Sequence, residues 1–442
     1  MTSVVPKIAI VGAGPAGLTL ARLLHVSGLK LEVTLLERDL SPASRREQGG
    51  TLDLHTHTGL AAIKKCGLWD EFQKHARYDG QEVILMDKNA TELVHKRVTS
   101  TLQDRPEIDR VWLRKILLDA VPGCWINWGR KVRTVTDDGK VRLDVLAEGN
   151  GGEVKAEGAE EEGPFDLIVG ADGAWSRVRQ RLMPHVTPRY SGVSGYEVAI
   201  FEPTKTCPHV DKMVGQGMFI GLSDRKSLNA QRLGDGSIRV RSWSYCPETE
   251  AQETLNKLGK EGTREKILER FATWAPEMTE PFRHGDLDSL MHMTLYELPV
   301  GSKWDHQKGF TLIGDAASLT TPFSGEGVNK AMKDSLELAE LIEKSQEPND
   351  DLTLDEAVLR YEKLMFPRAE KLQAKTILYR DAMLGPNAPL GLFSDMLKTI
   401  AGDSPSFFVR LLGSAPVVAL VYSYFWVYIQ IGWAVRKFWR RT

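Results

Sequence analysis

The stretch Val11-Gly12-Ala13-Gly14-Pro15-Ala16-Gly17 follows an apolar run near the start of the chain and opens a helix-like segment. Each glycine in it has a physical reason. Gly12 permits a tight turn, Gly14 removes the side chain where a backbone approaches a pyrophosphate, and Gly17 lets helix and strand pack closely. The stretch therefore predicts the turn of a dinucleotide-binding unit.

The residues on either side of this turn fit the same unit. Residues 4–11 predict a buried parallel strand, residues 16–27 a helix ended by Gly28, and residues 31–36 a second strand. Glu37 then ends the second strand, where a carboxylate can accept hydrogen bonds from ribose hydroxyls. The pattern predicts a Rossmann-type βαβ unit, but by itself it does not separate NAD from FAD.

A second motif, Asp166-Leu167-Ile168-Val169-Gly170-Ala171-Asp172-Gly173, runs from an apolar strand into a sharp turn. A helix is expected to begin near Ser176, and Asp172 can orient the turn and the neighbouring backbone. An ordinary strand–turn–helix connection would have the same local sequence, so the motif acquires meaning only beside the others.

A third motif, Gly314-Asp315-Ala316-Ala317, again follows an apolar strand, expected at 309–313. Asp315 at the strand end can accept from ribityl hydroxyls. A helix starting near Gly327 and Val328 would direct its positive end towards the ligand.

Composition narrows the function. The chain has 442 residues and a formal charge of -2, which gives no reason to expect nucleic acid as a partner. Its four cysteines lie far apart, without the spacing of a metal site. We expect free thiols in a reducing, intracellular compartment, with the catalytic part in the cytosol, and no metal.

The three motifs resemble those of FAD-binding enzymes, and this resemblance implies an α/β architecture: a Rossmann-type FAD-binding domain with an inserted β-sheet substrate domain and C-terminal helices. A Gly/Glu-rich stretch at 148–163 is expected to be a solvated hairpin loop, and 196–245 to be rich in strands. The expected segments are 1–185 (FAD-binding domain, first part), 186–300 (substrate-binding sheet domain), 301–385 (FAD-binding domain, second part, with a long helix) and 386–442 (C-terminal extension).

Together the three motifs resemble those of the aromatic-hydroxylase class of FAD monooxygenases. Three further stretches are similar to the tetracycline-inactivating flavin monooxygenases: GGTLDLH at 49–55, PEIDRVWLR at 106–114 and YEKLMF at 361–366. The resemblance covers roughly residues 5–385 and implies one non-covalent FAD with NADPH as reductant.

The resemblance also implies site residues. By position, Arg46 matches a residue that meets NADPH, whereas Asp53, Arg110, Arg114 and Asp315 match FAD contacts. Arg110 and Arg114 share a helix face, which would otherwise be a solvated basic face. The expected cofactor-binding residues are Gly12, Gly14, Gly17, Glu37, Arg38, Arg46, Asp53, Arg110, Arg114, Asp172, Asp315, Gly327 and Val328.

The substrate half departs from the pattern of the tetracycline enzymes. Glu197, Arg239 and Arg241 stand where those enzymes carry glutamine, histidine and glycine, and Met383 matches a substrate-facing methionine. Two arginines change the charge and volume of a pocket, so we do not expect tetracycline as the substrate. Solvent-facing strand positions are the alternative interpretation of Arg239 and Arg241.

The resemblance implies a reaction in which NAD(P)H reduces FAD, O2 adds at flavin C4a, and the distal oxygen of the hydroperoxide attacks a substrate. The expected substrate is hydrophobic and polycyclic or aromatic, in natural-product biosynthesis or xenobiotic modification. We assign no catalytic side chain: His55 and His57 can shuttle a proton or serve as structural residues. The alternatives are a flavin dehydrogenase or reductase, a non-catalytic binding protein, and a halogenase, whose WxWxI segment the sequence lacks.

The end of the chain is different. Residues 411–435 contain no Asp, Glu, Lys or Arg and are rich in Val, Tyr and Trp. This length suffices to span a bilayer, and the aromatic residues also suit a helix lying in the interface. We expect membrane association here, with a C-terminal core or lid helix as the alternative.

Overall fold

The computed structural model describes residues 5–45, 49–98, 105–149, 153–347 and 351–392, with isolated positions between 416 and 431. By their contacts the residues form two compact units. The first unit comprises 1–76, 107–189 and 296–374, and the second comprises 77–106, 190–295 and 375–442. Residues 77–106 thus join the second unit, although the sequence placed them in the first part of the FAD-binding domain. The functional assignment of the segments stays a prediction.

The first unit is built on a parallel sheet. Strands β1 (Lys7–Val11) and β2 (Glu32–Leu36) flank helix α1 (Pro15–Val26), as the βαβ prediction required. The sheet order is β17-β11-β1-β2-β7, with β7 at Ile126–Asn127, β11 at Leu167–Gly170 and β17 at Phe310–Leu312. Because β1, β11 and β17 are neighbours, the turns after them lie at one edge of the sheet. The α/β fold class is confirmed.

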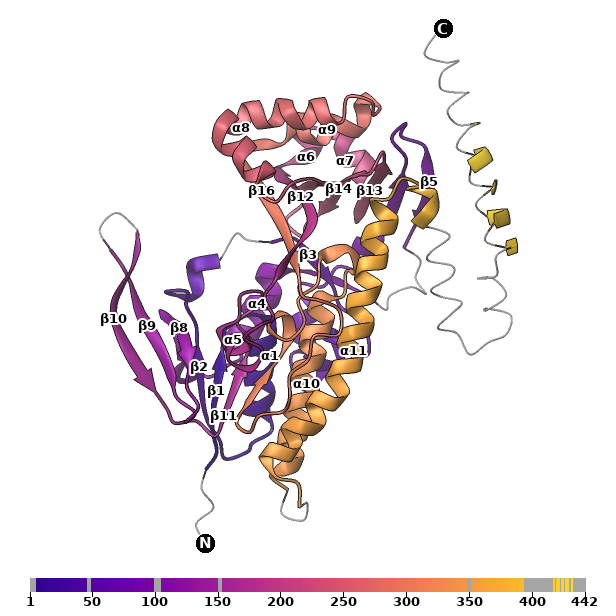
Figure 1. Cartoon of the computed structure of the whole chain (residues 1–442). Helices are drawn as coiled ribbons and strands as arrows, with labels where there is room; N and C mark the ends of the chain where they lie inside the picture. Colours follow the sequence, from indigo (N-terminus) through magenta and orange to yellow (C-terminus); the bar gives the residue numbers. More distant parts are fainter. Residues whose placement is uncertain are drawn as a thin grey trace. The chain divides into compact units, whose positions relative to one another are not determined.

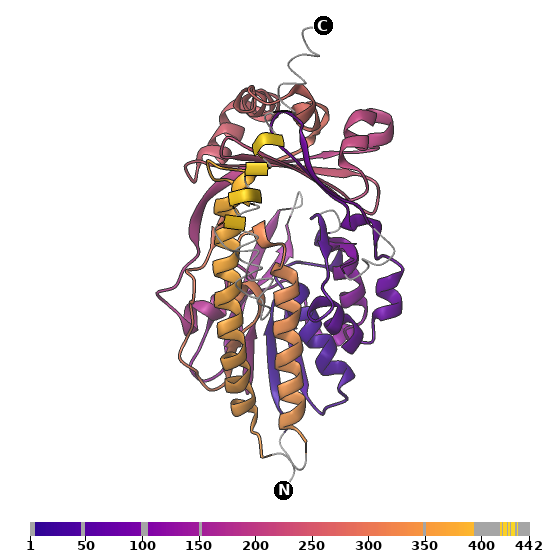
Figure 2. The same ribbon diagram turned by 90° about the vertical axis from the view of Figure 1, so that its right-hand side faces the viewer.

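Helices complete the core of the first unit. Helix α1 packs against α10 (Gly327–Ser345), which lies beside α11 (Leu354–Met383) in both Figures 1 and 2. Arg368 of α11 pairs with the buried Asp334 of α10 at 2.8 Å. The shorter helices are α2 (Gly59–Lys65), α3 (Trp69–Gln73), α4 (Arg110–Asp119) and α5 (Arg177–Leu182).

Two small antiparallel ladders extend this unit. One pairs β3 (Thr51–Asp53) with β6 (Glu107–Asp109). The other has the order β10-β9-β8, with β8 at Arg130–Val135, β9 at Val141–Glu148 and β10 at Val154–Glu162 (Figure 1). The prediction of a loop over 148–163 is therefore wrong. Its side chains are nearly all exposed, so the ladder with β9, and not a core, gives this polar segment its strand conformation.

The second unit is a larger sheet covered by helices. Its order is β16-β12-β15-β14-β13-β4-β5. Its strands are β4 (Val83–Met86), β5 (Glu92–Lys96), β12 (Arg189–Ile200), β13 (Met218–Ser223), β14 (Lys226–Arg232), β15 (Ile238–Tyr245) and β16 (Asp286–Glu297). Its helices are α6 (Pro203–Thr206), α7 (Pro208–Val214), α8 (Glu250–Arg270) and α9 (Pro276–His284). The predicted strand-rich block is confirmed, but the helices of this unit were not predicted.

One face of this sheet forms a separate core. Val198, Val240 and Leu228 on the strands pack with Phe271, Trp274, Met278 and Phe282 on or beside α8 and α9. Figure 1 shows α8 and α9 over this face. Directly paired residues point to the same side of a sheet, so the opposite face carries the residues that alternate with these.

The prediction of membrane association through 411–435 is contradicted. In the described parts of the chain, no helix is long and apolar enough to cross a bilayer. Spanning a bilayer takes an unbroken apolar helix, and a stretch without charged residues does not by itself specify one. Many positions of 411–435 lie outside the described residues.

Candidate functional site

The glycine turn after β1 separates glycines that packing requires from one that it does not. Gly12 has φ +106°, and a Cβ there would lie 2.5 Å from the Ala171 carbonyl oxygen. A Cβ on Gly17 would collide with the Gly12 carbonyl oxygen. Around Gly14, by contrast, no atom of the described residues lies within 4 Å of an added Cβ, and none of their side chains caps helix α1 there. The N-terminus of α1 is therefore open to a ligand of opposite charge.

The Glu37 carboxylate, which follows β2, accepts a hydrogen bond from the backbone of the glycine turn after β1. Glu37 is 4% exposed, and its oxygens accept hydrogen bonds from the backbone N–H of Ala13 at 2.6 Å and of Asp39 at 2.9 Å. A carboxylate has about four acceptor positions, so Glu37 can also accept from a hydroxyl of a bound ligand. The neighbouring Arg38 is exposed.

The turn after β11 holds a partly satisfied carboxylate. Asp172 Oδ2 accepts from the backbone N–H of Arg177 at 2.7 Å, and Ser176 caps α5 by accepting from the backbone N–H of Arg179 at 2.9 Å. Burial raises the pKa of Asp172. Asp172 Oδ1 is buried without a hydrogen-bond partner among the residues that the structure describes. Such an acceptor is suited to a donor from a ligand.

Arg179 connects this turn to the one after β17. It is 2% exposed, and its guanidinium donates to the carbonyl oxygens of Ala316 at 3.0 Å and Ala174. Burial lowers the pKa of Arg179, although Asp172 and Asp315 oppose this shift. Asp315 itself is exposed in the short helical turn 314–316. The two motifs are thus fixed to each other by one buried side chain.

Two buried charged side chains of α10 bind the backbone of the turn that carries the third motif. Lys330 Nζ donates to the carbonyl oxygens of Gly314 at 2.8 Å and Ser318 at 2.6 Å. Asp334 Oδ2 accepts from the Gly314 backbone N–H at 3.0 Å. Burial lowers the pKa of Lys330 and raises that of Asp334. The turn that presents Asp315 is therefore held by its backbone, which leaves the Asp315 side chain available.

The first turn of α10 organises the GGTLDLH segment. Asn329 is 1% exposed, and its Oδ1 accepts from the backbone N–H groups of His55 at 2.8 Å and Gly59 at 3.3 Å. Its Nδ2 donates to the Asp53 carbonyl oxygen at 2.8 Å. His55 Nε2 lies 2.8 Å from Asp53 Oδ2. Asn329 therefore places Asp53 and His55 beside the start of α10.

The same helix end has room for a ligand. Within the part of the chain that the structure describes, a Cβ on Gly327 would meet no atom within 4 Å, and no side chain caps α10. Val328 is partly buried in the first turn of this helix. The positive end of a long helix thus lies next to the Asp53–His55 pair.

The two arginines of α4 differ in their surroundings. Arg114 donates to the Pro42 carbonyl oxygen at 3.0 Å and lies 3.5 Å from Asp39, so it holds the loop after β2. Arg110 is exposed, and its side chain covers Gly49, whose φ is +113°. Arg110 rather than Arg114 has its side chain open to solvent, so the pair is not a uniform solvated face.

The expected substrate residues of the second unit lie on its other sheet face. Glu197 is directly opposite Arg241, and Ala199 is opposite Arg239. These positions alternate with Val198 and Val240, which belong to the core under the helices. Glu197, Arg239 and Arg241 therefore share the face turned away from α8 and α9.

These side chains are not solvent-facing. Arg241 Nε donates to Glu197 Oε2 at 2.5 Å, and the two side chains are 22% and 11% exposed. Arg239 is partly buried, and its guanidinium carbon lies over the Phe201 ring, 5.9 Å from the ring centroid. Met383, the last residue of α11, is 9% exposed. The face thus combines one ion pair with a further cation.

Comparison with known proteins decides the family. A family model described as "FAD binding domain" matches residues 6–358. Monooxygenase penA of Penicillium thymicola is 34% identical over 422 residues, which cover 84% of this chain and 93% of that protein. Monooxygenase asqM of Emericella nidulans is 35% identical over 379 residues, covering 76% and 84%.

The chain belongs to the FAD-dependent monooxygenase family. A solved structure of the tetracycline destructase Tet(51) superposes on this monooxygenase with a TM-score of 0.61, at 17% identity and covering 89% of this chain and 96% of that one. At such identity the match shows the shared fold. The predicted resemblance to this enzyme class is confirmed.

The monooxygenase carries structural features that suit FAD. Among the described residues, the space around Gly14 at the end of α1, the Asp172 Oδ1 without a hydrogen-bond partner and the space around Gly327 each leave room or an acceptor where a ligand would lie. The roles of the individual residues remain predictions. Arg46, expected to meet NADPH, lies outside the described residues.

Two supporting residues of the monooxygenase were not predicted. Arg179 and Asn329 were visible in the motifs but were not assigned a role, because a buried side chain that holds backbone groups has no sequence signature of its own. Asn329 could have been found from its position alone. It lies in the first turn of a helix whose N-terminus was predicted to face a ligand.

Proposed function

We propose that this monooxygenase uses NADPH to reduce FAD and inserts one oxygen atom of O2 into a hydrophobic, polycyclic or aromatic substrate. A role in natural-product biosynthesis or xenobiotic modification is part of the proposal. The observation that carries it is the meeting of the turns after β1, β11 and β17 at one sheet edge, where Arg179 joins the turn after β11 to the turn after β17.

The proposed cofactor contacts follow from the geometry of these turns. The pyrophosphate would lie over Gly14 at the open end of α1, and Glu37 would accept from a ribose hydroxyl. Arg110 is exposed beside Gly49 and suits a phosphate, whereas Arg114 would act by holding the loop after β2. Asp172 and Asp315 would accept hydrogen bonds from the remainder of the cofactor.

FAD, when bound, supplies the electron transfer and the activation of oxygen. The chain supplies position and charge. The positive end of α10 at Gly327 and Val328 would stabilise negative charge near it, because the helix dipole and its free N–H groups point that way. The Asp53–His55 pair, whose backbone groups Asn329 holds beside this helix end, could hold or move a proton.

The sheet face with Glu197 and Arg241 supports a substrate other than tetracycline. The Arg241 guanidinium and the Glu197 carboxylate pair at 2.5 Å and are little exposed, so each already has part of its hydrogen bonds. A ligand at this face would therefore meet a neutralised polar surface rather than an unpaired charge. Arg239, over Phe201, would add a cation that suits a phenolate or carbonyl oxygen. A polycyclic phenol combines the apolar surface and the polar oxygen that this face would take.

The test uses the full chain with FAD. NADPH is added without O2 and then in air, with and without a panel of polycyclic phenols, while flavin absorbance, NADPH and O2 consumption are followed. We expect anaerobic bleaching, recovery in air, and an oxygenated product formed in proportion to NADPH when a panel compound fits.

Two results would count against the proposal. A chain that stays colourless after reconstitution with FAD would refute the cofactor site. NADPH oxidation in air that yields hydrogen peroxide with every phenol of the panel would refute the substrate class.

A further inference from the structure

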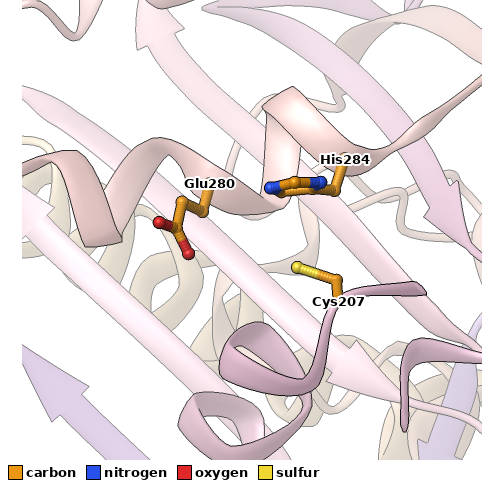
Figure 3. A group of neighbouring side chains, drawn as sticks. All are labelled: Cys207, Glu280 and His284. Carbon is orange, nitrogen blue, oxygen red and sulfur yellow. The ribbon is translucent and has the colours of Figure 1, made fainter. Parts of the chain in front are cut away.

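Three side chains of types that can bind a metal ion, from two distant parts of the sequence, meet in the second unit (Figure 3). Glu280 and His284 both belong to α9, four residues apart, and therefore lie on one face of that helix. Cys207 is the residue between α6 and α7. Figure 3 shows its sulfur pointing towards the space between the carboxylate and the imidazole.

The distances are near those of a coordination shell. One donor atom from each of the three residues lies within 4.8 Å of the other two. Donors around a tetrahedral zinc ion are separated by roughly 3.5 Å, given bond lengths of about 2.0–2.3 Å. Cys207 is 4% exposed and fixed, whereas His284 is exposed and the Glu280 side chain is 31% exposed. Small rotations of these two side chains would close the remaining gap.

The donor set selects a class of ion. A thiolate and an imidazole are ligands of zinc and its neighbours in the transition series, whereas calcium and magnesium take oxygen donors. A thiolate and a carboxylate together also balance a charge of +2. We propose that Cys207, Glu280 and His284 bind a divalent transition-metal ion, with zinc as the best fit and a fourth position open to water.

This site was not expected, because the cysteines of the chain are isolated from one another in the sequence. The relevant spacing is instead a cysteine near one helix and a Glu-x-x-x-His pair on another. A second imidazole, His209, lies beside the cluster, with its Nε2 3.7 Å from Glu280 Oε2 and its side chain 58% exposed. It can approach the open fourth position.

The location predicts what the metal does. Helix α7 packs against α9, and an ion held by Cys207 and by α9 would fasten the turn between α6 and α7 to that helix. The ion would then stabilise the outer layer of the second unit. It would contribute nothing directly to flavin chemistry, because none of the expected cofactor residues belongs to the cluster.

The experiment uses the FAD-loaded full chain without an affinity tag, stripped of metal with a chelator. Zinc affinity is measured by competition with a chromophoric chelator, and cobalt is added in parallel, because tetrahedral cobalt absorbs at longer wavelength than oxidised flavin. We expect one zinc per chain, tetrahedral cobalt bands that zinc removes, and a higher melting temperature with zinc. Millimolar magnesium or calcium should not compete.

Variants assign the ligands. Cys207→Ser should weaken zinc binding by about 100-fold, and His284→Ala, at an exposed position, by about tenfold or more. Cys124→Ser and His185→Ala are matched controls at exposed positions of the first unit and should leave binding unchanged. Flavin content and circular dichroism confirm that each variant is folded.

Unchanged zinc affinity in both Cys207→Ser and His284→Ala would overturn the proposal, as would the absence of saturable zinc binding in the parent chain. Since the readout is metal binding and melting temperature, a failure here is distinct from a failure of the proposed oxygenation.

Discussion

The two units hold their candidate residues in different ways. In the first unit the motif turns are held by hydrogen bonds to their backbone. The buried side chains of Asn329, Arg179 and Glu37 make these bonds. In the second unit the Glu197–Arg241 pair is side chain to side chain across two strands. A backbone-held site tolerates few substitutions and changes slowly, whereas a paired side chain on a sheet face can be exchanged without altering the fold. This difference fits a constant cofactor and a variable substrate.

The largest effect is expected from a substitution at Gly14, which tests whether the pyrophosphate of FAD binds at the start of α1. Gly14→Val adds atoms at a position where no described residue lies within 4 Å of a Cβ, so the chain should fold while FAD affinity falls by about 100-fold or more. FAD binding is measured by flavin fluorescence quenching. Gly123→Val is the control, since Gly123 also has no atom within 4 Å of an added Cβ. Equal FAD affinity in both variants would show that the pyrophosphate lies elsewhere.

Asn329 tests whether backbone bonds hold the Asp53–His55 pair. Asn329→Leu leaves buried N–H groups of His55 and Gly59 and the Asp53 carbonyl without partners, which should cost about 2–3 kcal/mol in the free energy of unfolding. Urea unfolding measures this loss. Asn329→Asp retains the acceptor and should lose less. If both variants unfold like the parent chain, the network does not support the first unit.

Glu197 tests the second unit. Glu197→Gln removes one charge of the pair with Arg241, so KM for an accepted phenol should change by about tenfold while FAD affinity stays constant. Glu265→Gln, at an exposed position of α8, is the matched control. A loss of FAD affinity in Glu197→Gln would contradict the division of roles between the two units.

Elements encoded by local sequence could be predicted, whereas contacts between residues far apart in the sequence could not. The glycine turns, strands β1, β2, β11 and β17 and helix α10 were predicted because local spacing and apolar runs encode them. Strand β10 was predicted as a loop, because its exposed polar side chains carry no periodic signal and only the ladder with β9 defines it. The Glu197–Arg241 pair joins residues 44 positions apart, and only the strand register shows it.

The smallest expected effect concerns Cys66, which lies in the core of the first unit beside α2. Burial raises the pKa of this thiol from 9.0 to about 12, although Arg22 opposes the shift. Between these values the folded chain binds more protons than the unfolded chain, so the stability that Cys66 contributes is complete below pH 9 and is lost as the pH rises towards 12. At about pH 9.5 the loss should be about 0.8 kcal/mol.

Other groups titrate in this range, so the comparison is made between the parent chain and Cys66→Ala, with the exposed Cys124→Ala as control. Cys66→Ala should flatten the fall of unfolding free energy with pH and Cys124→Ala should not; equal slopes in all three chains would mean that water reaches Cys66, and that the core beneath the glycine turns is less closed than its packing indicates.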